Sequence, residues 1–442
     1  MHRLIEAATS RPEGVSAEHF ARLLARLGPF EPRPAIAVAV SGGSDSMALA
    51  LLLDEWAIHR DARIEAITVD HGLRPDSGAE AGQVGRWLAG RRATRHTILR
   101  WTEAKPETGI QAAARAARYR LMTEHCRAEG ILHLCLAHHL DDQIETRAMR
   151  AARQSGPAGL AGMSAVREAA GVRLLRPLLG ITKQALRATL AARRQDWIED
   201  PSNRNPAFER ARLREGTPGQ DPRDAVPTLH RAGLERRRLE SDAAARLCAD
   251  LTIHDTGWAS LDPAALLDGE PASALAFAGL LQAIGGTDYP IAPERRLEAL
   301  ARLRELGPAG FTLGGCYLSV KAGHLEICRD WGAIGEETPI HPGMRLLWDR
   351  RFAVEIPQAL DGRVDLTIAR LGERGIRSLG RDPEKPESGT GDAIPISARK
   401  ALPALWQGDR LLAVPHLGFG PAVMVRFRPV NPATSSGFTV AY

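Results

Sequence analysis

The stretch Ser41-Gly42-Gly43-Ser44-Asp45-Ser46 places two glycines, three hydroxyls and a carboxylate in six residues. It lies between two apolar runs, 35–40 and 47–53, which predict a buried strand followed by a buried helix. Glycines let the backbone turn sharply and approach a ligand closely, and the first N–H groups of a helix attract anions. We therefore predict a phosphate- or pyrophosphate-binding loop. It lacks the Gly-Lys-Ser/Thr ending of a Walker A loop and the spacing of a dinucleotide fingerprint, and a plain serine-capped turn is the alternative.

A second polar cluster, His138-His139-Leu140-Asp141-Asp142-Gln143-Ile144-Glu145, follows another apolar run. Asp141 and Glu145 are four residues apart and share one face of a predicted helix. Helix capping explains one such carboxylate but not the paired histidines. The spacing matches no zinc pattern. Carboxylates next to a nucleotide phosphate can hold Mg²⁺ or a cationic substrate, and both interpretations stay open here.

Two further sets of polar residues accompany these clusters. Asp70 and His71 end the apolar run 64–70, so we expect them either to contact adenine or ribose or to form an ordinary polar strand end. Arg115 and Arg118 are three residues apart on a predicted helix, 110–129. They are candidates for substrate contacts, with simple solvated charges as the alternative.

Alternating strands and helices are predicted to position these residues. Predicted strands cover 35–40, 64–70, 96–100 and 131–137, and predicted helices cover 17–27, 47–53, 77–91, 110–129 and 141–153. This alternation predicts an open parallel α/β sheet. Ligands bind such sheets beyond the carboxyl ends of the strands. Because all three polar strand ends fall there, we expect them to line one crevice.

The rest of the chain changes character twice. We predict a flexible hinge or loop over 154–159, a helix over 182–194, an irregular stretch over 197–205 and a linker over 215–227. Beyond the linker we predict helices over 229–251, 271–284 and 293–306, and a hairpin over 311–328 that turns at Lys321-Ala322-Gly323. From about residue 337, proline and glycine separate short predicted strands. The sequence thus predicts three domains: 1–215, 225–335 and 336–442.

Composition limits the class of protein. No apolar run approaches the ~18 residues of a membrane span, and the first residues lack the apolar core of a signal peptide. The five cysteines are scattered, which argues for a reducing cytoplasm and against structural zinc. The net charge is +5, and only five of the 58 basic residues are lysine. This charge permits a nucleic-acid partner, although codon bias also explains an arginine excess.

The motifs together resemble the tRNA(Ile)-lysidine synthetase family, whose loop belongs to the N-type ATP pyrophosphatases. The matching pieces, in the order of the family, are Ser-Gly-Gly-Ser-Asp-Ser (41–46), Val-Asp-His-Gly-Leu-Arg (69–74), Gln-Ala-Ala-Ala-Arg-x-Ala-Arg-Tyr (111–119), Ala-His-His-Leu-Asp-Asp-Gln-x-Glu-Thr (137–146), Arg-Pro-Leu-Leu (176–179) and Glu-Asp-Pro-Ser-Asn (199–203). The resemblance is strong over about 33–214 and weaker beyond. It implies a PP-loop α/β domain similar to the adenine nucleotide alpha hydrolases, then a helical or α+β domain, then a small β-rich domain.

The resemblance also implies a reaction and its participants. ATP would adenylate the C2 oxygen of the wobble cytidine in the CAU anticodon of tRNA(Ile), and the ε-amine of L-lysine would then displace AMP. The implied catalytic residues are Asp45, His139, Asp141 and Asp142, with the general base left open. Ser41 to Ser46, Asp70 and His71 would bind ATP, and Asp45 and Asp142 would hold Mg²⁺. The implied substrate contacts are Arg115, Arg118, His138, Glu145, Arg210 and Arg214.

Two positions depart from the pattern of that family. Gln154 stands where the family usually has glycine, and Ala211 stands where it usually has asparagine. The two later domains would bind tRNA through arginine–phosphate contacts. We expect a cytoplasmic protein that does not bind a membrane, and we leave a homodimer open as its assembly.

Three rival functions follow from the same residues. A tRNA thiolation enzyme of this loop class would need catalytic cysteines, and only Cys135, inside a predicted strand, lies near the motifs. A metal-dependent phosphoesterase would use Asp70, His71, His138 and Asp141. A non-enzymatic RNA-binding module would leave the glycine loop without a role.

Overall fold

The computed structural model describes residues 13–153, 155–199, 222–305, 310–360, 365–380, 394–434 and 437–441. The chain forms two compact units, which are described separately. The first contains residues 1–237 together with 438–442, and the second contains 238–437. The predicted division into three domains stays a prediction. None of the helices within the described ranges is long and apolar enough to cross a membrane.

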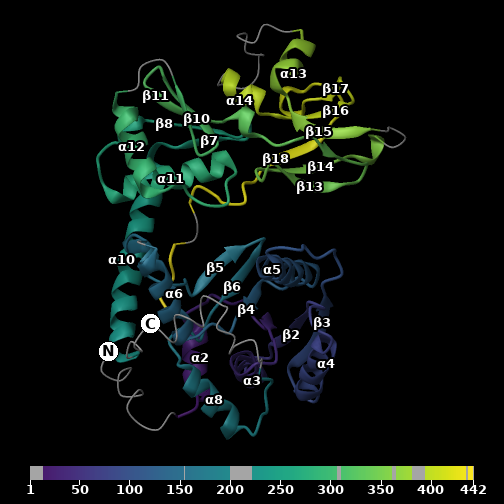
Figure 1. The fold of residues 1–442 in the computed structure, drawn as a ribbon, viewed down its shortest axis with the longest axis vertical. Coiled ribbons are helices and arrows are strands. Elements are labelled where there is room, and N and C mark those ends of the chain that lie inside the picture. The colour runs from purple at the N-terminus through teal and green to yellow at the C-terminus, as the bar shows by residue number, and fades with distance from the viewer. Residues whose placement is uncertain are drawn as a thin grey trace. The chain divides into compact units, whose positions relative to one another are not determined.

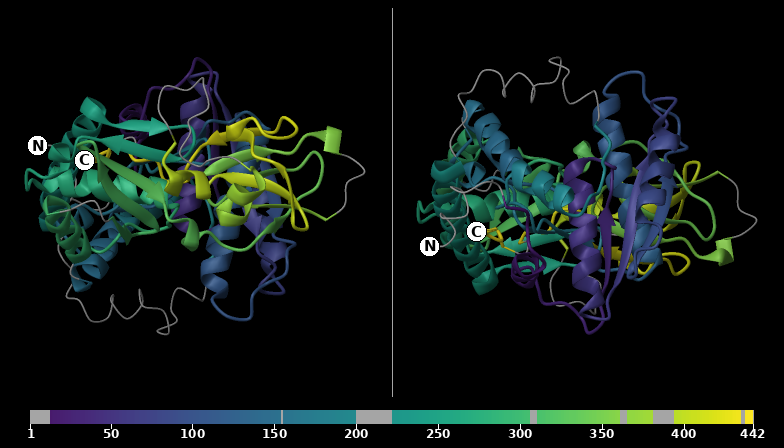
Figure 2. Two further views of the ribbon diagram at one scale, coloured as in Figure 1. Left: turned by 90° about the horizontal axis from the view of Figure 1, so that it is seen from above. Right: turned by 90° about the horizontal axis from the view of Figure 1, so that it is seen from below.

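The first unit is built on a six-stranded sheet with the strand order β3-β2-β1-β4-β6-β5 (Figures 1 and 2). Its strands are β1 (Ala35–Ala39), β2 (Arg63–Asp70), β3 (Thr94–Arg100), β4 (His133–Cys135), β5 (Val166–Ala169) and β6 (Val172–Leu175). All neighbours pair in parallel except β5, which is antiparallel to β6. The predicted open parallel α/β sheet is confirmed. The strand order reverses direction between β1 and β4, and the carboxyl ends at such a point form the usual ligand crevice.

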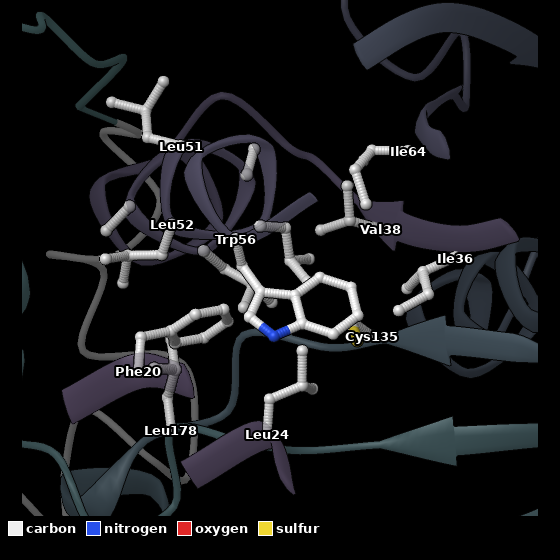
Figure 3. Packing of buried hydrophobic residues seen from close by; sticks show 14 of the residues in the cluster. Phe20, Leu24, Ile36, Val38, Leu51, Leu52, Trp56, Ile64, Cys135 and Leu178 are labelled. Carbon is white, nitrogen blue, oxygen red and sulfur yellow. The ribbon is translucent and has the colours of Figure 1, made fainter. Parts of the chain in front are cut away.

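Helices cover both faces of this sheet. They are α2 (Ala17–Ala25), α3 (Ser44–Ile58), α4 (Ser77–Leu88), α5 (Ile110–Ala128), α6 (Leu140–Ala152), α7 (Pro157–Leu160) and α8 (Lys183–Ala192). Residues of α2, α3, α4 and α8 share one hydrophobic cluster with β1 and β2, whereas α5 packs in another cluster on the opposite side. The first cluster is shown in Figure 3, where Trp56 lies among the side chains of Phe20, Leu24 and Ile36.

Helix α3 is buried because it is apolar on nearly every side. Met47 to Leu53 are fully buried, which is typical of a helix in the interior rather than at the surface. Each buried leucine contributes roughly 1.5–3 kcal/mol by removal of its side chain from water. The start of α3, which carries the glycine loop, is therefore held rigidly against the sheet.

The helix α10 (Pro222–Asp250) crosses from the first unit into the second. The second unit then forms a five-stranded sheet of β7 (Thr252–His254), β8 (Trp258–Leu261), β9 (Phe311–Leu313), β10 (Cys316–Lys321) and β11 (His324–Arg329), against which α11 (Pro271–Gly285) packs beside α12 (Pro293–Arg304). The predicted hairpin turn is confirmed: Lys321 pairs with His324, and Ala322 and Gly323 both have positive φ.

The last part of the second unit is mostly β, as predicted. A four-stranded sheet contains β12 (Thr338–Pro339), β15 (Leu366–Arg370), β16 (Pro403–Gln407) and β17 (Arg410–Ala413), and a three-stranded sheet contains β13 (Arg345–Trp348), β14 (Phe352–Glu355) and β18 (Met424–Phe427). Two short helices, α13 (Gly372–Ser378) and α14 (Ile396–Lys400), accompany them.

Three predictions of secondary structure were wrong in part. The predicted linker 215–227 is helical from Pro222 onward, and Pro227 lies inside α10. The predicted strand 131–137 is regular only over β4, and the predicted loop 154–159 contains the start of α7. The remainder of the linker lies outside the described residues, as do 200–205 of the predicted irregular stretch.

A buried ionic triad connects the two parts of the second unit. Asp349, in the turn between β13 and β14, accepts hydrogen bonds from Arg329 Nε and Nη2, both at 3.0 Å, and from Arg351 Nε at 2.7 Å. Arg329 ends β11, so the triad joins the five-stranded sheet to the later hairpin. All three side chains are buried, and one carboxylate serves two guanidinium groups.

We predict that Asp349→Asn destabilises the protein by about 3–5 kcal/mol, because it leaves two buried guanidinium groups without a counter-charge. Asparagine tolerates the positive φ of position 349, so backbone strain does not confuse the result. Urea denaturation followed by circular dichroism measures the change. The matched control is Asp409→Asn, which removes a fully exposed partner of Arg374 and should change the stability by less than about 1 kcal/mol. Equal effects of the two variants would contradict this account of the triad.

Candidate active site

The glycine loop connects the end of β1 to the start of α3, as predicted. Gly42 has φ +87°, and a Cβ atom there would lie 2.7 Å from Ile198 Cδ1, so the backbone requires glycine at this position. Gly43 is the N-cap of α3, and no side chain caps the helix. The first N–H groups of α3 therefore point out of the helix at its positive end, which is the arrangement that binds phosphate.

The hydroxyls of this loop shape it from within. Ser46 Oγ donates to Gly43 O at 3.0 Å and accepts from Ser41 N at 3.1 Å. Ser44 Oγ donates to Asp45 Oδ1 at 3.0 Å. In this structure these bonds fix the conformation of the loop and the position of Asp45, and the assignment of Ser41, Ser44 and Ser46 to ATP binding stays a prediction.

The imidazole of His139 lies at the centre of the site. Its Nε2 atom is 3.3 Å from Asp45 Oδ2 and 3.6 Å from Asp142 Oδ2, and its Nδ1 atom is 3.3 Å from Asp141 Oδ2. Only 3% of the His139 side chain is exposed. The Nδ1 contact is an ion pair rather than a directed hydrogen bond. Of the four residues that the resemblance implied as catalytic, Asp45, Asp141 and Asp142 therefore surround the ring of the fourth, His139.

The charges in this cluster support one another. Burial by itself lowers the pKa of His139, but the contacts with Asp141 and Asp45 and the charge of Asp142 raise it to about 10. Burial raises the pKa of Asp45 and Asp141, but the contacts with His139 and Lys183 together outweigh it, with a further hydrogen bond from Ser44 to Asp45. The pKa of Asp45 is therefore lowered, and that of Asp141 falls to about 2. His139 is thus an imidazolium at neutral pH, and Asp45 and Asp141 are carboxylates.

Lys183 also belongs to the site, although the sequence analysis did not select it. Its Nζ atom is 3.7 Å from Asp45 Oδ2, and its backbone N–H donates to Asp141 Oδ2 at 3.0 Å. It is the first residue of α8. A signal was present in the sequence, because Lys183 is one of only five lysines in an arginine-rich chain and lies four residues after the Arg-Pro-Leu-Leu motif.

Asp70 and His71 lie at the end of β2, next to β1 in the sheet. Asp70 Oδ1 accepts hydrogen bonds from Ser77 Oγ at 2.7 Å and Gly72 N at 2.9 Å, which lowers its pKa and shapes the turn before α4. The ring of His71 meets Trp101 edge-on at 6.0 Å. Burial and the charge of Arg118 lower the pKa of His71. This histidine is neutral at physiological pH, and its buried Nδ1 atom has no hydrogen-bond partner among the described residues.

The other candidate residues have different surroundings. The guanidinium of Arg115 lies over the ring of Tyr119 at 5.2 Å, and Arg118 lies one turn further along α5, close enough to His71 to affect its pKa. His138 and Glu145 are both half-buried. His138 precedes α6, and Glu145 lies on its second turn. Arg210, Arg214 and Ala211 lie outside the described residues, as does Gln154.

The donor atoms of the site suit Mg²⁺ that is shared with nucleotide phosphates better than a metal ion coordinated only by protein side chains. No group of three or more His, Cys, Asp or Glu side chains within the described ranges is arranged to hold a metal. Mg²⁺, however, is commonly bound by one or two carboxylates together with phosphate oxygens. Asp45 and Asp142 are each about one-quarter exposed beside the anion-binding end of α3, which suits that kind of site.

The cysteines do not suit thiol chemistry at this site. Cys135 lies inside β4 and is fully buried, and burial raises the pKa of its thiol. Burial and the charge of Glu65 likewise raise the pKa of Cys126 to about 12. Nucleophilic cysteines need a lowered pKa and access to the substrate, and neither residue has them.

These features define a class of protein. The sequence pattern of the PP-loop domain matches residues 15–217, which include the sheet, the glycine loop and the His139 cluster. The chain therefore contains a PP-loop domain that binds ATP.

Relatives then identify the family. A tRNA(Ile)-lysidine synthase of Ruegeria pomeroyi is 36% identical over 88% of this chain and 90% of its own length. One of Brucella anthropi is 34% identical over 92% of this chain and 91% of its own, and one of Rhodopseudomonas palustris is 46% identical over 54% and 70%. The chain belongs to the tRNA(Ile)-lysidine synthase family, whose members are ligases. The solved structure of a U34-tRNA thiolase, NcsA of Methanococcus maripaludis, covers 48% of this chain and 78% of its own at 17% identity, with a TM-score of 0.40.

The two glycines of the loop offer a matched test of its geometry. We predict that Gly42→Ala lowers the free energy of unfolding by at least about 1–2 kcal/mol, because alanine is strained at positive φ and its Cβ atom meets Ile198 and Val84. Gly43→Ala should leave the stability nearly unchanged, since Gly43 has φ −71° and its nearest neighbour would be Ser41 Oγ at 3.7 Å. Thermal unfolding without nucleotide compares the two. A larger loss for Gly43→Ala would show that the loop has another shape.

Proposed function

We propose that this enzyme ligates L-lysine to C2 of the wobble cytidine in the CAU anticodon of tRNA(Ile). In the first step the C2 oxygen attacks the α-phosphate of ATP, and pyrophosphate leaves. In the second step the ε-amine of lysine attacks C2, the bond from C2 to the adenylate oxygen breaks, and AMP leaves. The observation that carries this proposal is the ring of His139 among the carboxyl groups of Asp45, Asp141 and Asp142, beside the uncapped start of α3.

Each element of the site has a distinct part in the first step. The N–H groups at the start of α3 would bind phosphate oxygens of ATP, and the ammonium of Lys183 would neutralise the charge that develops on pyrophosphate. Asp45 and Asp142 would hold Mg²⁺, which would neutralise phosphate charge when bound. Asp70 and His71 would contact the adenine or ribose, and the unpaired Nδ1 atom of His71 supports such a contact.

The second step requires a site for a cation and a group that removes a proton. Asp141 has the most exposed carboxylate of the cluster, at 48%, so it is the best candidate to bind an ammonium group of lysine, with Glu145 one turn further along α6. The contacts with Asp141 and Asp45 raise the pKa of His139 to about 10, which suits a cationic group better than a general base. Its role would be to hold the carboxylates in place.

The tRNA would meet arginines outside this cluster. Arg115, Arg118 and His138 would contact the anticodon loop, whose single-stranded bases unstack at low cost. Arg210 and Arg214 remain candidates for the same role. The second unit would bind the rest of the tRNA through phosphate contacts. A cytoplasmic location and a homodimer belong to the same proposal.

The test uses the full-length chain with ATP and a tRNA transcript that carries a CAU anticodon. We expect pyrophosphate release that depends on the tRNA and incorporation of radiolabelled lysine in preference to other amino acids. A transcript with uridine at the wobble position is the matched control and should accept no lysine. Incorporation of sulfur, or AMP release driven by another amino acid, would overturn the proposal.

Two neighbouring aspartates should separate the two steps. We predict that Asp142→Asn lowers pyrophosphate release at least about tenfold, because it removes a charged ligand for Mg²⁺ while its amide oxygen still accepts the bond from His139 N. Asp141→Asn should retain pyrophosphate release and lose most of the response to lysine. The measurement scores pyrophosphate release and lysine incorporation separately on one tRNA preparation. If both variants keep wild-type rates in both steps, the cluster is only a helix cap.

A further inference from the structure

The last described residues of the chain return to the first unit. We call Phe438–Ala441 the return segment, and it forms a compact unit with residues before 238 (Figure 1, yellow). Thr439 pairs with the chain between α7 and β5 through two hydrogen bonds: its C=O accepts from Ala165 N at 2.9 Å, and its N–H donates to Ser164 Oγ at 3.0 Å. A segment that is remote in sequence thus fixes residues 164 and 165.

The return segment is anchored by packing as well. Only 4% of the Phe438 side chain is exposed, and the guanidinium of Arg236 lies over its ring at 4.7 Å. Gly233 of α10 leaves room for it, since a Cβ atom there would lie 3.1 Å from Phe438 and 3.3 Å from Val440. Burial of the aromatic ring and the cation–π contact with Arg236 both stabilise this anchor.

The segment that the return segment contacts is a bridge to the active-site helix. We call Ala158–Ala165 the bridging segment. Arg150 of α6 donates through Nη1 to Gly159 O at 2.7 Å and to Gly162 O at 2.8 Å. Arg176 Nη1 donates to Ser164 O at 2.8 Å. Side chains therefore hold the bridging segment through its backbone carbonyls, and the backbone of Thr439 adds contacts with Ala165 N and Ser164 Oγ at its end.

Gln143 carries the connection into the first turn of α6. Its side-chain amide is buried and pairs with Met163 in both directions: Nε2 donates to Met163 O at 3.1 Å, and Oε1 accepts from Met163 N at 2.6 Å. Its backbone N–H donates to His139 O at 3.2 Å. Gly162 has φ +72°, and a Cβ atom there would lie 2.6 Å from Gln143 Oε1, so the bridging segment is shaped to receive this amide.

We propose that the return segment positions the first turn of α6 and, through it, the carboxylates around His139. The path runs from Thr439 to Ser164, through the adjacent Met163 to Gln143, and from Gln143 to His139. This inference rests on the proposed function, because it assigns a role in that reaction to residues that touch neither substrate nor nucleotide. Displacement of reacting groups by about 1 Å can cost roughly a hundredfold in rate, so a small shift of this turn has a measurable effect.

The first experiment removes the return segment from the full-length protein. A chain that ends at Gly437 should incorporate lysine with a kcat at least tenfold lower, while the KM for ATP changes less than threefold. Hydrogen exchange should become at least tenfold faster in a peptide that covers 139–145 and stay unchanged in one that covers 47–58 of α3. A chain that ends at Ala441 is the matched control, and it should behave as the wild type.

The second experiment removes one hydroxyl group from the full-length chain. It tests the same inference if the shortened chain does not fold. Ser164→Ala removes the acceptor for Thr439 N, so kcat should fall about threefold to tenfold and exchange in 139–145 should rise. Ser164→Thr keeps the hydroxyl and should restore both. Unchanged exchange and unchanged kcat in these variants would overturn the inference, and so would a general loss of protection throughout the unit that threonine does not reverse.

The two readouts separate this inference from the proposed function. If the wild-type chain incorporates no lysine, the proposed function fails. Hydrogen exchange in 139–145 then still tests whether the return segment stabilises the first turn of α6. If the wild-type chain is active and the variants match it in both readouts, only the inference about the return segment fails.

Discussion

The buried ring of His139 holds the candidate active site together. Three carboxylates, each with an oxygen within 3.6 Å of a nitrogen of the His139 ring, would repel one another if no cation lay between them. The ring of His139 supplies that cation, and in return the carboxylates keep it charged despite its burial. Removing the ring would leave the carboxylates without their shared counter-charge.

This arrangement depends on two strands being neighbours. β1 and β4 pair in parallel, with Val38 opposite Cys135, so the carboxyl ends of both strands lie at the same edge of the sheet. The loop after β1 leads into α3 and delivers Asp45, and the turn after β4 leads into α6 and delivers His139, Asp141 and Asp142. Residues almost a hundred positions apart in the sequence therefore meet, because helices α3 and α6 begin side by side at the point where the strand order reverses.

The sequence predicted the parts of the fold that have strong periodicity. The parallel strands β1 and β2 and the long helices were readable, since their apolar residues continue over several turns or repeats. β5 and β6 were missed because each has only four residues and both contain arginine. The start of α10 was missed because its prolines and acidic residues are typical of linkers, although proline fits the first turn of a helix.

The candidate site was predictable in its residue types but not in its contacts. Glycine, histidine and aspartate motifs indicated the loop and the cluster, whereas the meeting of Lys183 with Asp45 depends on how α8 packs against α3. The direction of each hydroxyl was equally inaccessible, so the internal bonds of Ser41 and Ser46 could not be predicted, and their assignment to ATP binding stays a prediction. These contacts and hydroxyl directions depend on tertiary packing and cannot be predicted from the local sequence.

Two segments outside the PP-loop motifs, α10 and the return segment, help to hold α6 in place. Leu140, the first residue of α6, packs in a small buried cluster with Ala225 and Leu229 of α10, and the bridging segment is held by the return segment. The chain therefore leaves the first unit through a helix that contacts α6 and comes back through a segment that reaches α6 by way of Gln143. A chain ended before α10 would expose Leu140 and release the bridging segment at once. Loss of activity in such a fragment would then report on the stability of the active-site helix as well as on lost contacts to tRNA.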